Sequence, residues 1–385
     1  MVFRTFKLSL LYACYWVSSC MIYSYAERFL LHYGFRTDEI GISVAIAYLA
    51  AMIVQPALAQ AADRERAVTL RSGICICALV AIALAASTVL STRVLPLLAV
   101  LFGAMTCVTL AAQPLINAVG FHYINRGDEI DFSFARGAAS VAYALSSLLL
   151  GYLASKNIDS ILWVYVVANA GMFLIALRFA PHRTGLAIRK TPENVFSAMR
   201  HYPRLTLFCA GMLILNVPHL FINSYLASIS QVTGGNMSVM IALAAVVEFP
   251  AMMAYSHLRK RIPDRVLLLV SASIYLIKTG LLLLAAVLKT ATWIVYLSFL
   301  LQMFCYAIFV PASSFFANDA VSEQDQVKGQ MLLTETGLFS GMISMLLGGL
   351  SLQHLGVTYS LLLCEGFILC GVALIALAVR RRKTA

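Results

Sequence analysis

Charged residues are scarce in this chain, and motifs that mark several enzyme classes are missing from its sequence. Lys, Arg, Asp and Glu together make up 12% of the 385 residues, whereas hydrophobic residues make up 61%. Soluble chains carry about 25% charged residues, so the composition excludes a soluble enzyme. The sequence also lacks the Gly-x-x-x-x-Gly-Lys-Ser/Thr loop that cradles nucleotide phosphates and the zinc-binding His-Glu-x-x-His helix. We therefore expect no ATP-driven pumping by this chain alone.

Paired catalytic groups are missing as well. An intramembrane enzyme, such as a lipid-modifying transferase or a protease, needs a nucleophile with a base or two carboxylates at one site. We find no such constellation in the sequence. The nine cysteines lie in apolar runs, and Cys75-Ile76-Cys77 has no nearby histidine that could complete a metal site. We predict that the chain is not an enzyme and holds no metal and no cofactor.

Long hydrophobic runs, by contrast, are abundant. A membrane-spanning helix needs about 20 apolar residues, and twelve such helices fit into 385 residues with little room for another domain. We predict an all-α membrane protein with twelve transmembrane helices. The runs are residues 8–31, 40–60, 73–91, 94–118, 134–155, 159–179, 204–229, 236–257, 266–288, 291–317, 329–352 and 356–379.

The basic residues indicate how these helices are oriented. With the N-terminus inside, 21 of the 28 Lys and Arg residues fall in inner segments and five fall in outer segments. This bias is the positive-inside pattern of membrane proteins. We therefore predict a multi-pass plasma membrane protein, bacterial and monomeric, with an uncleaved first helix and both termini in the cytoplasm. The same dispersion accounts for the net charge of +11 without a nucleic-acid partner.

The longest polar stretch divides the chain after six of the twelve runs. We predict an N-terminal six-helix half over residues 1–181, a cytoplasmic linker over 182–203 and a C-terminal six-helix half over 204–385. Each half has a similar inner-side turn after its second helix, ALAQAADRERAV at 57–68 and YSHLRKRIPDRV at 255–266. Two six-helix halves are typical of the major facilitator class of secondary transporters.

Two ionisable residues within the predicted spans are candidate solute ligands. A charge at membrane depth costs about 2.5–3.5 kcal/mol and usually faces a cavity or a partner. Glu248 lies mid-span beside Pro250; its alternative role is a neutral carboxyl packed between helices. Arg136 shares a helix face with Ser140 and Tyr143. The small residues between them leave space for a ligand, although they would also permit close helix packing, and the arginine could instead reach the inner surface.

The seventh predicted span carries a polar stripe of Asn216, His219 and Asn223. A lone histidine in a span is either a structural residue or a proton carrier, and both interpretations stay open. Lys278 and Glu335 are expected to pair with each other or with His219, because pairing offsets the desolvation of a buried charge.

Neutral amides stand in two further predicted spans. Asn117 and Gln302 can each donate to and accept from a hydroxyl group, and Tyr143 offers a flat apolar face. Together they suit a polyhydroxylated ligand such as a sugar or nucleoside, although hydrogen bonding between helices would use the same residue types. Glu365, in the last predicted span, is expected to be a packing residue.

Several of these segments resemble one transporter family. The opening YSYAERFLLHYGFRTDEIGISVAIAYLAAMIVQPALAQAADR and the stretches PLINAV, ARGAASVAY, VVEFP and LLQMF are similar to the oligosaccharide/proton symporter branch of the major facilitator superfamily, which contains lactose permease. The similarity extends over essentially the whole chain.

The resemblance implies roles for five residues. Arg136 and Glu248 would be the charged ligands of the solute hydroxyls, and Tyr143 would stack on a sugar ring. Asn117 stands in the place of a frequent substrate-binding acid. Asp63 corresponds to the acidic residue of a loop motif that helps to gate the cytoplasmic side, although the usual glycines of that motif are absent.

The tenth predicted span departs from the family pattern. Gln302 and Cys305 occupy positions where lactose permease has a histidine and a proton-coupling glutamate. Three titratable candidates for proton coupling remain: Glu248, His219 and Glu335. Glu248 is preferred, because a carboxyl that is protonated in one step and ligand-bound in another links the two events. The alternative is a facilitator with no coupled ion.

We therefore predict a secondary active transporter that moves a small polar solute, a sugar, oligosaccharide or nucleoside, across the lipid bilayer with protons. The mechanism is alternating access around a midplane site. The alternative is an exporter of drugs or metabolites with the same fold, whose cavity would be dominated by aromatics and methionine. The predicted solute ligands are Arg136, Glu248, Tyr143, Asn117, Gln302 and Asn223.

Overall fold

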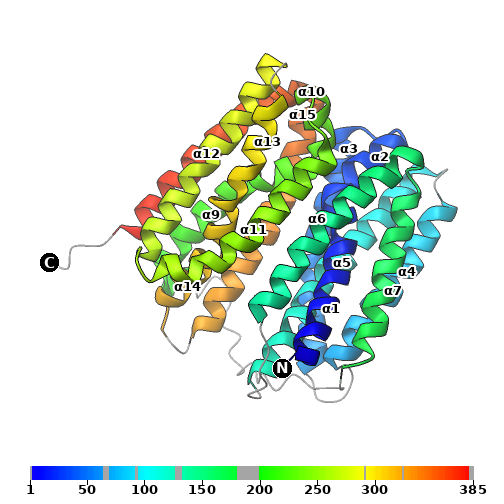
Figure 1. Ribbon diagram of the computed structural model, residues 1–385, viewed down its shortest axis with the longest axis horizontal. Coiled ribbons are helices and arrows are strands. Elements are labelled where there is room, and N and C mark those ends of the chain that lie inside the picture. Colours follow the sequence, from blue (N-terminus) through cyan, green and yellow to red (C-terminus); the bar gives the residue numbers. More distant parts are fainter. Residues whose placement is uncertain are drawn as a thin grey trace. The chain divides into compact units, whose positions relative to one another are not determined.

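The computed structural model describes residues 2–63, 69–91, 94–125, 132–179, 199–289, 292–322 and 325–380. Every regular element in these ranges is a helix, so the predicted all-helical class is confirmed. The chain forms two compact units, Met1–Thr191 and Pro192–Ala385. Figure 1 shows the helices of each unit, coloured along the sequence.

Unit 1 is a bundle in which the first helix packs against the last two. Helix α1 contacts α6 and α7, while α5 contacts α3 and α4, and α4 also contacts α7. The bounds are α1 Val2–Ser24, α2 Ala26–His32, α3 Thr37–Asp63, α4 Leu70–Leu90, α5 Leu95–Asn125, α6 Phe132–Lys156 and α7 Ser160–Ala176.

Unit 2 has a similar plan. Helix α9 packs along α15, and α12 contacts α13, α14 and α15. The bounds are α9 Pro203–Ser224, α10 Leu226–Thr233, α11 Met237–Arg259, α12 Asp264–Leu288, α13 Thr292–Leu300, the 3₁₀ helix η1 Leu301–Met303, α14 Tyr306–Asp319 and α15 Gln326–Val379.

Helix α15 is two helices joined at Gly356. This residue has φ 76° and ψ 175°, a conformation that glycine adopts without the steric penalty of a Cβ. The apolar part of α15, Gly329–Val379, is 51 residues long, far more than the roughly 20 residues that one membrane crossing needs. The break at Gly356 falls where the sequence separates the eleventh predicted run from the twelfth.

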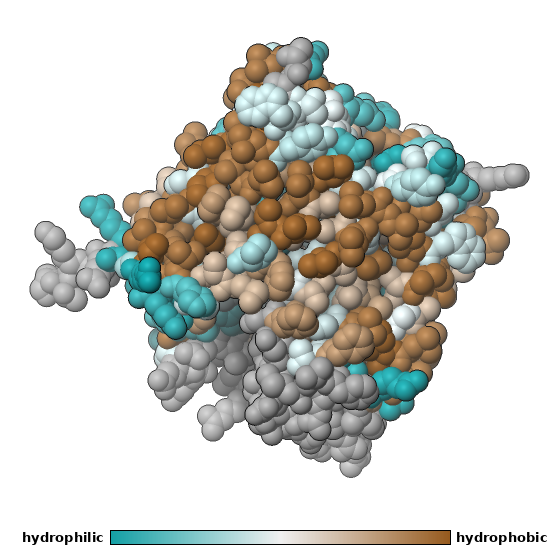
Figure 2. Space-filling view, viewed as in Figure 1, coloured by the Kyte–Doolittle hydropathy of each residue, from teal (hydrophilic) through white to brown (hydrophobic). Residues whose placement is uncertain are grey.

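Large hydrophobic side chains cover the outside of the described helices. Ile53, Val100, Trp163 and Val167 are each more than 60% exposed. On the face shown in Figure 2, hydrophobic residues cover most of the middle of the helices and hydrophilic residues gather near helix ends. In water such a surface would aggregate, whereas lipid solvates it. Nine described helices are long and apolar enough to cross a membrane, and the chain is a multi-pass membrane protein.

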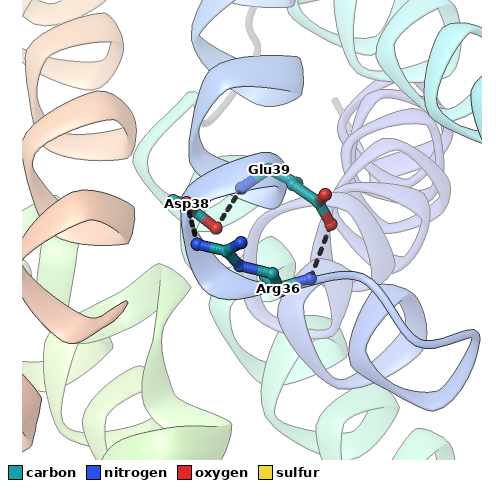
Figure 3. A network of polar contacts seen from close by, with 3 residues as sticks. All are labelled: Arg36, Asp38 and Glu39. Carbon is teal, nitrogen blue, oxygen red and sulfur yellow. Dashed lines mark hydrogen bonds and ion pairs between the residues drawn. The ribbon is translucent and has the colours of Figure 1, made fainter. Parts of the chain in front are cut away.

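The start of α3 is held by its own charged residues (Figure 3). Glu39 Oε2 accepts a hydrogen bond of 2.9 Å from the backbone N–H of Arg36, and the Arg36 guanidinium donates to Asp38 Oδ2 at 2.8 Å. Carboxylates are stabilising at a helix N-terminus, where backbone N–H groups have no helical partner. This exposed network therefore fixes where α3 begins.

Both units contain the same break in their first long helix. Helix α1 ends at Ser24 and helix α9 ends at Ser224, and in each case a buried tyrosine follows before a short helix begins. The hydroxyl of Tyr25 donates to the carbonyl of Ser147 in α6 at 2.5 Å, and the hydroxyl of Tyr225 donates to the carbonyl of Met345 in α15 at 2.7 Å. Each tyrosine thus ties a helix break to the neighbouring helix of its own unit.

Candidate functional site

In unit 1, three predicted solute ligands lie around α1. The Arg136 guanidinium carbon, on α6, is 4.5 Å from the centroid of the Trp16 ring. The Trp16 ring meets the Tyr143 ring edge-on at 5.8 Å, and the Tyr143 hydroxyl shares a hydrogen bond of 2.8 Å with Ser24 Oγ. Arg136 and Tyr143, predicted to share one face of a helix, therefore meet on a single tryptophan.

Asn117 joins the same group through a second aromatic residue of α1. Its Oδ1 accepts a hydrogen bond of 2.8 Å from the hydroxyl of Tyr12, which lies one helical turn before Trp16. We call Tyr12, Trp16, Ser24, Asn117, Arg136 and Tyr143 the arginine cluster. Within the described residues of unit 1, Arg136 forms no ion pair, and its positive charge faces the π system of Trp16.

In unit 2, the predicted ligands Glu248 and Gln302 are in direct contact. Gln302 Nε2 donates to Glu248 Oε1 at 2.9 Å, and Gln302 Oε1 accepts from Lys278 Nζ at 2.6 Å. Glu248 lies on α11, Lys278 on α12 and Gln302 on η1 between α13 and α14. We call these three residues the carboxylate cluster. A buried amide here bridges an anion and a cation.

The surroundings of Lys278 correct one expectation. Lys278 is 1% exposed, its Nζ lies 5.2 Å from the centroid of the Phe299 ring, and its hydrogen-bond partner is Gln302. Within the described part of the chain, no ion pair joins Lys278 to Glu335 or to His219. The predicted pairing of Lys278 with Glu335 or His219 was wrong, because the ammonium donates to the neutral amide oxygen of Gln302 instead.

The polar stripe of α9 is partly packed and partly unsatisfied. His219 Nε2 lies 3.2 Å from Asn223 Nδ2, and the imidazole stacks on the Tyr306 ring with centroids 4.6 Å apart. Among the described residues, His219 Nδ1 and the Tyr275 hydroxyl are buried with no hydrogen-bond partner. The structure therefore brings His219 and Asn223 together, but it shows His219 as a packed residue of the unit 2 interior.

Three further predicted residues lie on α15 or at the end of α3. Glu335 is half-buried on α15. Glu365, further along α15, lies against Gly280 of α12, and its Oε1 is buried with no hydrogen-bond partner among the described residues; its packing role stays a prediction. Asp63 is the last residue of α3, but its side chain lies outside the described residues, so its gating role stays a prediction.

Sequence reasoning missed Tyr12, Trp16 and Lys278 as members of these clusters. Tyr12 and Trp16 are spaced four residues apart, which places them on one face of α1; that spacing was the available signal. The arginine cluster offers the donors of a guanidinium, one amide and aromatic faces, and the carboxylate cluster offers one amide and the acceptor oxygens of a carboxylate. Such groups can hold hydroxyl groups and the flat face of a ring.

The fold is shared with solved transporter structures. The "nucleoside transporter NupG" superposes with a TM-score of 0.78 at 15% identity, covering 97% of this chain and 98% of that chain. The "xylose transporter XylE from E. coli" gives a TM-score of 0.76 at 10% identity, covering 100% of this chain and 98% of that chain. A POT family transporter in complex with a thioalcohol conjugated peptide gives 0.72 at 12% identity, with 96% and 95% covered.

No curated protein matches the chain. The sequence model of the MFS_1 like family, however, matches residues 5–362, which is nearly the whole chain and includes every residue of both clusters. The chain therefore belongs to the MFS_1 like family of the major facilitator superfamily.

Proposed function

We propose that this protein is a secondary transporter that moves a small, polar, hydroxylated solute with a ring, a nucleoside or a sugar, across the plasma membrane. The observation that carries the proposal is the pair of clusters, because each one places charged and amide groups inside helices that are otherwise apolar. Polar groups at membrane depth are costly, and they mark solute or ion pathways. The similarity in fold to nucleoside and xylose transporters supports the same class of solute.

Twelve membrane crossings account for the helices best. The nine long apolar helices include Gly329–Val379, which is long enough for two crossings. The helix Ser160–Ala176 is apolar but shorter, and α1 with α2 supplies a further crossing. Twelve crossings place both termini on one side, and the positive-inside pattern makes that side the cytoplasm. We propose six crossings before and six after the linker at 182–203.

Arg136 and Glu248 are each proposed to bind a hydroxyl group of the solute. A hydrogen bond to a charged group contributes about 1.5–3 kcal/mol. Two such bonds would therefore contribute a large part of the binding free energy. Tyr143 provides a ring face and Asn117 an amide, while Gln302, also predicted as a ligand, contacts Glu248 through its own amide nitrogen. Asn223 is a further proposed ligand. Alternating access then exchanges inward-open and outward-open states around the bound solute.

Proton symport is the proposed mode of coupling. Glu248 is the preferred proton carrier, since the carboxyl that binds the solute can also exchange a proton. His219 and Glu335 are the alternative carriers. An uncoupled facilitator would show solute uptake into tight liposomes without the entry of protons, measured with an enclosed pH-sensitive dye.

Solute counterflow in liposomes tests the function. We expect Glu248→Gln and Arg136→Ala to weaken the binding of uridine or xylose by roughly 10- to 150-fold, equivalent to about 1.5–3 kcal/mol. Matched controls are Glu365→Gln, the same change at a packing residue, and Arg36→Ala at an exposed turn; both should transport like the wild type. Unchanged binding in both Glu248→Gln and Arg136→Ala would contradict the assignment, and a response only to lipophilic cations would indicate an exporter.

A further inference from the structure

The carboxylate cluster contains a charge for which the proposed binding of hydroxyl groups has no use. Lys278 is 1% exposed and Gln302 is 2% exposed, whereas Glu248 is half-buried. The chain of contacts therefore runs from a fully buried ammonium, through a buried amide, to a carboxylate at the accessible end. A solute that reaches this cluster meets Glu248 and not Lys278.

A buried ammonium needs a compensating partner, because removing a charge from water is costly. Lys278 Nζ contacts the amide oxygen of Gln302 at 2.6 Å, and the amide nitrogen of Gln302 contacts Glu248 at 2.9 Å. Only this orientation of the amide makes both contacts attractive, since its oxygen accepts from the cation and its nitrogen donates to the anion. The amide dipole is thus aligned between the two charges, and each contact polarises the other.

The backbone around Gln302 departs from regular α-helix. Gln302 lies in a single 3₁₀ turn, and Cys305, which follows the turn, has φ −91° and ψ −87°. Cys305 Sγ also lies 3.8 Å from Gln302 Oε1. On the other side, Ser298 Oγ donates to the backbone carbonyl of Lys278 at 2.9 Å. The amide and the lysine are therefore each held by neighbours outside the carboxylate cluster.

We propose that Lys278 is the built-in counter-charge of Glu248, acting through Gln302, and that this link positions the Glu248 carboxylate for solute binding. With the link intact, the lysine and the carboxylate together carry no net charge, which favours neutral hydroxylated solutes over cations. Lys278 is thus a positioning residue that does not touch the solute. This inference rests on the proposed role of Glu248 as a solute ligand.

A double-mutant cycle on the full-length protein tests the link, with Lys278→Met, Glu248→Gln and the combined variant. Lys278→Met should lower the melting temperature by roughly 5 °C or more, since it removes the cation to which the carboxylate is linked. The combined variant replaces both charges with neutral side chains of similar shape, so its melting temperature should return to near that of the wild type. Additive losses of melting temperature would overturn the proposal.

The affinities of the same three variants for uridine and for xylose test whether Lys278 positions the Glu248 carboxylate. Lys278→Met should weaken the binding of whichever probe the wild type accepts by about tenfold, and the combined variant should bind like Glu248→Gln alone. Lys278→Met that binds as the wild type does, or losses that multiply in the combined variant, would overturn the positioning role. If the wild type binds neither probe, the proposed solute class fails, while the recovery of melting temperature still decides the link.

Discussion

The two units share a frame but differ in the chemistry that the frame carries. Tyr25 and Tyr225 tie equivalent helix breaks to neighbouring helices, and Gly171 and Gly371 stand at equivalent close contacts with the first long helix of their units. In the arginine cluster the cation lies over one aromatic ring, that of Trp16, whereas in the carboxylate cluster an amide contacts two opposite charges. The helix packing is therefore similar in the two units, while the polar residues inside them differ.

The largest expected difference between the units concerns their buried amides. Gln302→Leu should lower the free energy of unfolding by about 3–5 kcal/mol, because it removes the amide that contacts both the Lys278 ammonium and the Glu248 carboxylate. Asn117→Leu should lower it by only about 1 kcal/mol, since one neutral hydrogen bond to Tyr12 is lost. Unfolding in detergent micelles measures both, with exposed Gln231→Leu as the control. Equal losses would show that Gln302 does not bridge charges.

Glycine contacts give the next largest difference. A Cβ at Gly371 would lie 2.9 Å from the backbone nitrogen of Leu215, while a Cβ at Gly171 would lie 3.0 Å from the Cys14 Sγ. Backbone cannot move aside as a side chain can, so we expect Gly371→Ala to destabilise by about 2–3 kcal/mol and Gly171→Ala by about 1 kcal/mol or less. Gly366→Ala, with nothing within 4 Å, is the control. A larger loss of stability in Gly171→Ala than in Gly371→Ala would contradict the helix contacts described within each unit.

A smaller effect isolates the aromatic character of the arginine cluster. Trp16→Leu removes the ring that faces both Arg136 and Tyr143, and a cation–π contact contributes about 0.5–2 kcal/mol. We expect the affinity for uridine or xylose to fall by roughly 2- to 30-fold, measured by ligand-dependent thermal shift. The control is Trp163→Leu, a change at a tryptophan that is 61% exposed. Equal affinities in Trp16→Leu and the wild type would mean that the ring does not prepare Arg136 for the solute.

The sequence was sufficient for the all-helical membrane class, because each crossing of a bilayer needs a long apolar run. Each predicted apolar run coincides over most of its length with described helices, and the last predicted run begins at Gly356, where α15 is broken. Helical periodicity also placed Arg136 and Tyr143 on one face, which their shared contact with Trp16 confirms.

Contacts between distant helices could not be predicted in the same way. Trp16 lies in an apolar run, and the sequence of that run does not distinguish a ring that faces lipid from a ring that faces a guanidinium. Lys278 was assigned to a charged partner because Coulomb attraction is the usual reason to bury a lysine, yet its contact is a neutral amide that also binds Glu248. Such a three-residue chain depends on the relative rotation of α11, α12 and η1, which no local pattern encodes.

The smallest expected effects test the frame that the units share. Tyr25→Phe and Tyr225→Phe each remove one hydroxyl that donates to a backbone carbonyl, of Ser147 and Met345 respectively. A buried neutral hydrogen bond contributes about 1 kcal/mol, and the ring remains to fill its space.

Both variants should therefore lower the free energy of unfolding by about 1 kcal/mol, and the two losses should agree within about 0.5 kcal/mol. Thermal unfolding in detergent compares them with Tyr152→Phe and Tyr359→Phe, controls at tyrosines that are each 63% exposed. The tyrosine after α1 and the tyrosine after α9 make the same kind of hydrogen bond to a neighbouring helix. A large loss of stability in one unit alone would show that the two units share this contact but not its contribution to stability. Equal losses would show that the two hydrogen bonds contribute alike to the stability of their units.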